Sequence, residues 1–332
     1  MKNELLQAGC ELLADNKDLI HKNFTWDYDM MSAVGGMIFT GAGKVADVAR
    51  MKQCKSILKK QEGLFSNFRG NMEIPVISKM ALAEDPDTYL RELLTVYGKL
   101  HEGKLFGSEY MALTALCICD GNGAGRVDEI AGKTKMLIKR MKEVHPFLTS
   151  DEDLAFTALL AMTPKTVDQI IEETEICYQT MKNQFAFHSN AVQSLSHVMT
   201  LGEGSPEEKC GKVIQIYNAL ANRGIKYGKE YELASLGALV NLEIDADQLA
   251  DEIAEASEYL KTRKGFGAWG MGSKPRQMFA ALLVSYAHSG ENAAMDASVL
   301  GGSLSLVIAE EVAIMAAITA AAAASNAANS SQ

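Results

Sequence analysis

The chain has 332 residues, of which 48% are hydrophobic, and a formal net charge of −10 at pH 7. This length and hydrophobic content allow an extensive core, and the acidic excess argues against nonspecific binding to nucleic acid or to acidic membranes. Only 6 prolines, an abundance of Leu, Ala, Met, Glu and Lys, and the lack of a convincing strand pattern predict an all-α protein.

An opening helix is expected over residues 3–22, and a helix-turn-helix unit recurs from about residue 30 onward. Small apolar triplets mark the first helix of each unit, at 114–116, 157–159, 196–198, 237–239 and 280–282. The fourth of these helices is expected to run from Tyr231 to Leu242. The second helices have their own markers, at Tyr97, Ile138, Tyr178 and Tyr217. Both sets are spaced about 40 residues apart, which predicts an α-solenoid of about six to seven helix-turn-helix repeats.

Turn residues agree with this register. Ser108, Ser150, Ser189 and Ser273 stand where first helices should begin, and a serine hydroxyl there accepts a backbone N–H that would otherwise be unpaired. The pairs Asp85-Pro86, Thr163-Pro164 and Ser205-Pro206 are expected to open second helices, where proline costs no hydrogen bond.

The organisation predicted along the chain has three parts. Residues 1–290 form a single helical-repeat domain, residues 291–324 form an Ala-rich helical segment, and residues 325–332 form a disordered tail. Glu310 and Glu311 divide the Ala-rich segment into apolar runs shorter than the roughly 18 residues needed to span a bilayer. We therefore expect no membrane span but a capping helix over the open end of the array, with self-association through this segment as the alternative.

The N-terminus is acidic and lacks the long apolar core of a signal peptide. The 6 cysteines are scattered over largely apolar helix positions, at 10, 54, 117, 119, 177 and 210. They indicate buried, reduced thiols rather than disulfides or metal ligands. A cytoplasmic location is the consistent expectation.

Each turn into a first helix should fall on the same edge of the array, so that polar residues distant in sequence come into line. The candidates for a ligand or partner groove are Arg69, Asn71, Glu109, Tyr110, His188, Asn190, Gln193, His197, Glu232, Trp269, Lys274 and Arg276; Asp151, Asp153, Lys229 and Glu230 belong to the same row. Capping, solvation and salt bridges between repeats form one interpretation. The other is a polar groove for an extended partner or a small ligand.

The first helix around residues 186–201 carries more polar residues than its equivalents, including Gln193, Ser196 and His197. Buried polar groups need partners, so this helix packs in a polar network or lines a cavity. His188 and His197 are nine positions apart and therefore poorly placed to share a metal on one helix. No metal site is predicted.

Two glycine-rich stretches fail as nucleotide motifs. Gly265, Gly267 and Gly270 match G-x-G-x-x-G, but a helix and not a strand precedes them. We expect a flexible turn there that presents Trp269 for contact. Residues 36–44 also miss the phosphate-loop pattern. No nucleophile elbow, HExxH or paired CxxC occurs, and no cofactor is expected.

Two basic patches interrupt the acidic composition. One lies within residues 50–60, and the other comprises Lys133, Lys135, Lys139, Arg140 and Lys142. Each falls on a predicted helix among apolar positions. A solvated outer face is the plainer interpretation, and a phosphate-binding surface is the alternative.

Several segments resemble one protein family: NFRGN (67–71), HPFLTSDED (145–153), NAVQSLSHVMTLGE (190–203), KYGKEYELASLGAL (226–239) and GFGAWGMGSKPRQMFAALLV (265–284). On these motifs the chain is similar to the Domain of Unknown Function 4003 family, found largely in Firmicutes. The resemblance covers most of the chain. It implies a cytoplasmic bacterial protein without an established activity, and it supplies no catalytic residues.

Two hypotheses for function follow. The first is a noncatalytic scaffold that binds a protein or peptide along a concave face or the polar edge, as helical arrays do. The second is an enzyme or a small-ligand or metal-binding protein, with its site built from the turns between repeats. A scaffold should have a long shallow groove, whereas an enzyme should have a deep pocket where perturbed ionisable groups converge.

Overall fold

The computed structural model describes residues 1–24, 29–60, 66–102, 107–146 and 148–289. Within these ranges every regular element is a helix, which confirms the predicted all-α class for the part of the chain described. The α-helices are α1 (Glu4–Phe24), α2 (Asp29–Gly41), α3 (Val48–Lys60), α4 (Glu73–Leu82), α5 (Pro86–His101), α6 (Glu109–Asp120), α7 (Val127–Val144), α8 (Leu154–Met162), α9 (Val167–Gln184), α10 (Ser189–Leu201), α11 (Pro206–Asn222), α12 (Ala234–Gly237), α13 (Ala246–Lys261) and α14 (Ser273–Ser289).

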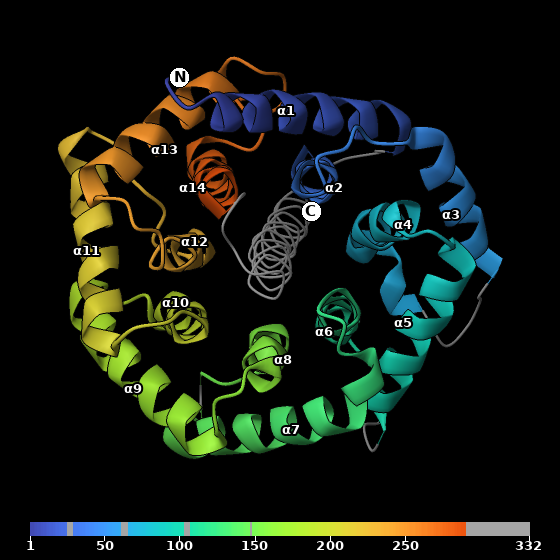
Figure 1. Cartoon of the computed structure of the whole chain (residues 1–332), viewed down its shortest axis with the longest axis horizontal. Helices are drawn as coiled ribbons and strands as arrows, with labels where there is room; N and C mark the ends of the chain where they lie inside the picture. Colours follow the sequence, from blue (N-terminus) through green and yellow to red (C-terminus); the bar gives the residue numbers. More distant parts are fainter. Residues whose placement is uncertain (25–28, 61–65, 103–106, 147, 290–332) are drawn as a thin grey trace, which may run out of the picture.

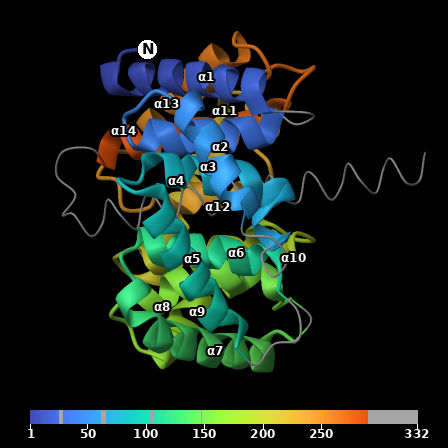
Figure 2. The same cartoon turned by 90° about the vertical axis from the view of Figure 1, so that its right-hand side faces the viewer.

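The helices form a ring with two layers (Figure 1). Even-numbered helices make the inner layer and run along the axis of the ring, where Figure 1 views them nearly end-on; odd-numbered helices lie obliquely around them. The side view of Figure 2 has α1 and α13 at one extreme and α7 and α9 at the other, with α6, α10 and α12 between. Every helix predicted to be the first of its pair is an inner helix.

The first helix of the chain closes the ring. Helix α1 packs against α2 and also against α13 and α14, from the far end of the described chain. Lys17 Nζ donates a hydrogen bond to Lys264 O at 2.9 Å, and Asn3 Nδ2 lies 3.3 Å from His288 Nε2. The sequence predicted an array with an open end. Instead, α1 takes the outer position beside α14, the inner helix for which no second helix was found.

Burial explains which helices are inner. Residues Met111–Cys119 of α6 and Leu154–Ala161 of α8 are buried without interruption, as expected for a helix that is apolar around its whole circumference. The outer helix α11 instead buries Val213, Ile216 and Leu220 on one face and leaves the other in water. The apolar first helices therefore occupy the inner layer, and the amphipathic second helices cover them.

One inner helix is shorter than expected. The sequence predicted a helix as far as Leu242, but α12 ends at Gly237 and the chain continues in tighter i→i+3 bonds, such as Leu239 N to Leu236 O. Gly237 is where α12 meets α10, because a Cβ atom on Gly237 would lie 2.7 Å from Val198 Cγ1. The absence of a side chain permits this close packing.

The predicted caps are confirmed in part. Ser189 is not a cap, because it is the first residue of α10, and the preceding residue, His188, makes no side-chain cap. Ser108 accepts the N–H of Met111, and Ser150 forms a capping box with Asp153. Pro86 and Pro206 begin α5 and α11, as predicted. The prediction for Thr163-Pro164 is wrong, because α9 begins at Val167 and Thr166 provides the cap through a capping box with Gln169.

The predicted Ala-rich segment (291–324) and tail (325–332) lie outside the described residues, so their roles stay predictions. Among the described helices, none combines the length and apolar character needed to cross a membrane.

Candidate functional site

The turns that lead into the inner helices lie on one rim of the ring, called here the N-terminal rim. It comprises residues 66–72, 107–108, 145–146, 148–153, 185–188, 223–233 and 262–272. Hydrogen bonds link successive turns: Asn71 Nδ2 donates to Glu109 Oε2 at 3.2 Å, and His188 Nδ1 lies 2.9 Å from Glu230 Oε1. The structure therefore brings candidates from neighbouring helix pairs into contact, two at a time.

The most buried of these contacts joins α8 to α10. Gln193 Nε2 donates to Asp153 Oδ1 at 2.9 Å, and His197 Nδ1 lies 3.6 Å from the same oxygen, beyond hydrogen-bonding distance. Burial raises the pKa of Asp153 to about 6, against the opposing effect of hydrogen bonds from Ser150 N–H and Gln193. Burial, with a smaller contribution from His145, lowers the pKa of His197 to about 3. At neutral pH the carboxylate is ionised and the imidazole is neutral.

A small polar cavity adjoins this contact. It has a volume of about 20 Å³ and lies between α7, α9 and α10. Thr149, Gln193 and His197 line it, and each has one side-chain atom, Oγ1, Oε1 and Nδ1 respectively, that is buried without a hydrogen-bond partner among the described residues. A cavity of this size holds one water molecule, and three polar partners are the number such a water typically has. The chemistry that this space supports is hydration, since it is too small for a metabolite.

Glu232 and Arg276 are also buried, but they lie in different parts of the rim, before α12 and at the start of α14. Arg276 Nη1 donates to Phe266 O at 2.9 Å and Nε donates to Ser257 Oγ at 3.2 Å, so it ties the turn before α14 to α13. Burial raises the pKa of Glu232, whose Oε2 has no partner among the described residues. A Cβ atom on Gly228 would lie 2.5 Å from that oxygen, so the turn encloses the carboxylate tightly.

The remaining candidates are dispersed. Arg69 is half-buried on the turn before α4, Tyr110 packs against the core at the start of α6, and Asn190 and Lys274 are exposed. The predicted set therefore makes local pairs along the rim, and the structure does not gather it into one pocket.

Two aromatic side chains project from the N-terminal rim. Trp269 and Phe187 are 104% and 101% exposed, against a fold that buries most of its large apolar side chains. Trp269 sits on a turn closed by a hydrogen bond from Met271 N to Gly265 O at 2.9 Å. Phe187 has a φ of 71°, a conformation that costs a bulky residue roughly 1–2 kcal/mol. Its neighbour Phe185 is buried against Tyr217, so the chain reverses sharply and turns Phe187 outward.

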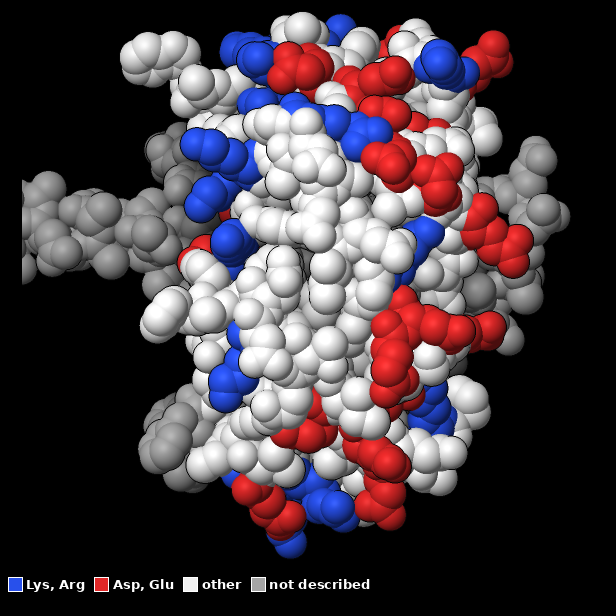
Figure 3. Space-filling view, turned by 90° about the vertical axis from the view of Figure 1, so that its left-hand side faces the viewer, with Lys and Arg blue, Asp and Glu red and all other residues white. Residues whose placement is uncertain are grey.

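Charge is divided between the two rims. Figure 3 shows the side formed by α9, α11 and α13, with Lys and Arg along one edge and Asp and Glu along the other. These outer helices have acidic first turns, at Asp168, Glu207 and Asp247, whereas α9 and α13 end in Lys182 and Lys261. This order complements the helix dipole. The basic ends belong to the N-terminal rim, beside Phe187 and Trp269.

The opposite rim, where the inner helices end, is called here the C-terminal rim. Charged side chains of the outer helices form hydrogen bonds with its backbone carbonyls. Residues of alternating sign recur about 40 positions apart, at Arg50, Glu92, Lys133, Glu173, Lys212 and Glu252. Arg50 Nη2 donates to Ala83 O at 2.6 Å, Lys133 Nζ donates to Thr163 O at 2.8 Å, and Lys212 donates to Ile244 O. Arg50 and Lys133 thus cap the carbonyls that end α4 and α8, whereas Lys212 binds a carbonyl in the segment between α12 and α13.

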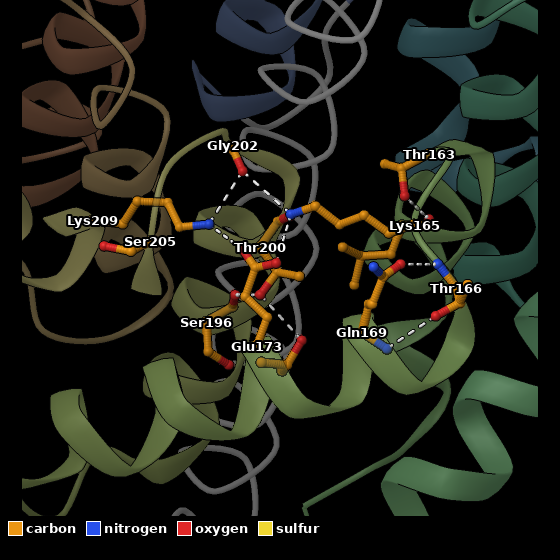
Figure 4. Close-up of polar contacts among 12 residues, drawn as sticks. Thr163, Lys165, Thr166, Gln169, Glu173, Ser196, Thr200, Gly202, Ser205 and Lys209 are labelled. Atoms are coloured by element: carbon orange, nitrogen blue, oxygen red, sulfur yellow. Dashed lines mark hydrogen bonds and ion pairs between the residues drawn. The ribbon is translucent and has the colours of Figure 1, made fainter. Parts of the chain in front are cut away.

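Where Glu173 takes such a position, two lysines supply the missing cation. Figure 4 shows Lys165 and Lys209 directed toward Gly202 from opposite sides, with Glu173 near both. Lys165 Nζ donates to Thr200 O and to Glu173 Oε2, each at 2.7 Å, and Lys209 Nζ donates to Gly202 O at 3.1 Å and to Glu173. This cluster joins α9, the end of α10 and α11, and every member has a structural partner.

The cysteines are all free and buried, as predicted. Burial raises the pKa of Cys10 to about 12 and that of Cys54 to about 11, which keeps these thiols protonated and unreactive. Within the described ranges, no group of three or more His, Cys, Asp or Glu side chains is placed to hold a metal ion.

A family model described as "Protein of unknown function (DUF4003)" matches residues 16–313. The chain belongs to this family. No curated protein and no solved structure matches it. The family match covers the whole described ring except the first turns of α1, and its description assigns no activity.

Sequence reasoning missed Phe187, Thr149 and the charged caps of the C-terminal rim. The alternation of Arg50, Glu92, Lys133 and Glu173 was readable from the repeat spacing. Phe187 gives no such signal, because its exposure depends on a positive φ that nothing in the sequence requires of a phenylalanine.

Proposed function

We propose that the chain is a noncatalytic binding protein, and that a protein partner docks on the N-terminal rim between Lys182 and Lys274. The exposure of Phe187 at a φ of 71° is the observation that carries the proposal. Backbone strain that presents an apolar ring to water contributes nothing to the isolated fold, and such strain is concentrated at functional sites. Trp269 offers a second anchor on the same rim, and aromatic side chains dominate binding hot spots.

Charge supports a partner with an acidic segment. Five lysines are exposed on this part of the rim, and none makes a direct ion pair in the portions of the chain that the structure describes, although the charge of Lys274 acts on Glu232: Lys182, Lys226, Lys229, Lys264 and Lys274. Complementary charge steers association and selects partners, although the affinity comes chiefly from buried anchors. The partner is thus an acidic segment with at least one apolar residue to meet the aromatic rings.

The alternative, an enzyme or a ligand-binding protein whose site is built from the turns between repeats, has less support. It needs Glu109, His188, His197 and Glu232 to converge, whereas each lies in its own turn or pairs with a neighbour. The small cavity beside Gln193 and His197 has space for a single water. Perturbed pKa values at Asp153 and His197 follow from burial in that contact, and structural networks shift pKa values as active sites do.

A pull-down from a lysate of the source cell tests the proposal. A partner should bind the wild-type chain, bind about tenfold more weakly to Phe187→Ser/Trp269→Ser, and be released by raised salt. Lys226→Glu/Lys229→Glu should weaken the same partner. Glu203→Lys/Glu207→Lys on the opposite rim is the matched control and should leave binding intact. Equal capture by all of these variants would contradict the proposal.

We also propose that the helix pairs are structural repeats of about 40 residues, and hence that the ring is an α-solenoid closed on itself. The recurrence of capping charges at this spacing supports the repeats. A bacterial, cytoplasmic setting agrees with the free, buried cysteines. Self-association through residues 291–324 stays an alternative for oligomer formation, and sedimentation of the full chain at several concentrations tests it.

A further inference from the structure

A groove runs along the outer face of α7, away from the aromatic pair. It lies between the end of α5, the face of α7 and the start of α8, and its volume is about 570 Å³. Leu100, Ala131, Ile138 and Leu154 contribute its apolar surface. Pockets of roughly 300–1,000 Å³ are the usual size for small-molecule ligands, whereas a stable protein interface needs a broader surface.

Three lysines border the groove on one side. Lys135, Lys139 and Lys142 follow one another at spacings of four and three residues, so they share a face of α7 next to Ile138. All three are exposed, and none makes a direct ion pair among the described residues, although the charge of Lys142 acts on the buried Asp153. The other basic residues of α7 differ: Lys133 caps Thr163 O, and Arg140 Nη1 lies 3.1 Å from Asp168 Oδ1.

Because the groove has apolar surface beside exposed ammonium groups, its ligand should have both an apolar part and a negative charge. The apolar side excludes a fully polar anion, because such an anion would lose hydration there without compensation. The lysines favour an anionic head, and flexible ammonium groups suit a single compact charge rather than the bidentate geometry that arginine provides. A hydrocarbon chain ending in a carboxylate meets both conditions.

We propose that this groove binds a long-chain carboxylate, with its alkyl chain against Ile138 and Leu154 and its carboxylate among Lys135, Lys139 and Lys142. Two carboxylates also line the groove: Glu143, whose Oε2 lies 3.7 Å from Arg140 Nε, and Asp151, in the turn before α8, which disfavours a second anionic group at that end. The site is separate from the proposed partner surface, so either can be present without the other.

Dodecanoate, below its micelle concentration, is the probe for calorimetric titration of the full chain. We expect one molecule bound per chain, and about tenfold weaker binding with Lys139→Glu or Ile138→Asp. Ile138 and Lys139 are not fully buried, so both variants should fold, and circular dichroism checks this. Lys182→Glu, which changes an exposed lysine at the end of α9, is the matched control and should bind normally.

The head group is tested separately with dodecanol and dodecyltrimethylammonium, which carry the same chain without a negative charge. Both should bind at least about tenfold more weakly than dodecanoate. The proposal is overturned if dodecanoate does not bind, if the groove variants bind as well as the wild type, or if the three head groups bind equally.

Discussion

At the scale of single residues, the pKa values of Asp153 and His197, which lie in contact, are shifted in opposite directions. Burial disfavours the charged form of both groups, so it raises the pKa of the acid and lowers that of the base. Neither shift requires a ligand. The contact between the two side chains accounts for the perturbed pKa values at this position and leaves a small cavity beside them.

The pH dependence of stability should reveal this opposition. The folded pKa of His197 is about 3, below its ordinary 6.5, so its contribution is complete above pH 6.5 and is lost as pH falls toward 3. The folded pKa of Asp153 is about 6, above its ordinary 3.8, so its contribution is complete below pH 3.8 and is lost as pH rises through 6. Between pH 4 and 6 the two slopes nearly cancel.

Replacement of His197 by Gln removes one of these titrations. From pH 4 to 6, the unfolding free energy of the wild type should stay nearly constant, whereas that of His197→Gln should fall. The difference between the two should grow by at most about 1.4 kcal/mol per pH unit. Urea unfolding at pH 4, 5, 6 and 7 measures the difference. A difference that stays constant with pH would mean that His197 is protonated to the same extent in the folded and unfolded chains.

At the scale of elements, the ends of the inner helices depend on cations from elsewhere in the chain. Two outer helices provide them directly, through Arg50 and Lys133, and Lys212 binds a carbonyl in the segment that follows α12. Helix α9 carries Glu173 at the corresponding position; Lys165 approaches it from the turn before α9 and Lys209 from the start of α11. Glu173 accepts hydrogen bonds from both lysines, so the contact between α9, the end of α10 and α11 is an ionic cluster.

Loss of Glu173 should therefore be costly. The Lys209 side chain is only 3% exposed, so Glu173→Gln leaves a buried ammonium group without its carboxylate. We expect the free energy of unfolding to fall by about 3 kcal/mol. Glu172→Gln, at the exposed preceding position, should change it by less than about 0.5 kcal/mol. Chemical denaturation of both variants checks this, and equal effects would contradict a special role for Glu173.

Helices were predictable from sequence because their signals are local. The apolar spacing and caps such as Ser108 and Ser150 lie within a few residues of the backbone that they organise. The prediction failed at Pro164 and at Leu242, where a competing cap at Thr166 and the close approach of Gly237 to Val198 decided the outcome. Contacts such as Gln193 with Asp153 join residues 40 positions apart and depend on the rotation between helix pairs, which spacing does not specify.

At the scale of the whole molecule, the sequence predicted stacked helix pairs but not their closure. Each pair turns by a small angle relative to the last, and that angle arises from the sizes of many packed side chains. Only its accumulated value determines whether the ends meet. The packing of α1 beside α14 could have been predicted only from the fact that α14, the final inner helix, has no outer helix after it in the predicted array.

Because Asn3 and His288 touch, the beginning and end of the described chain are neighbours, and the position of the termini is arbitrary with respect to the ring. A circular permutant that starts at Gly204, ends at Glu203 and joins Gln332 directly to Met1 should keep its helical circular dichroism and melt within a few degrees of the wild type. Gly204 is exposed on the C-terminal rim, where new termini are best tolerated. Loss of the helical signal would contradict closure. A permutable ring of this kind is a frame into which a second domain can be inserted at Gly204, while the proposed partner surface on the N-terminal rim stays free.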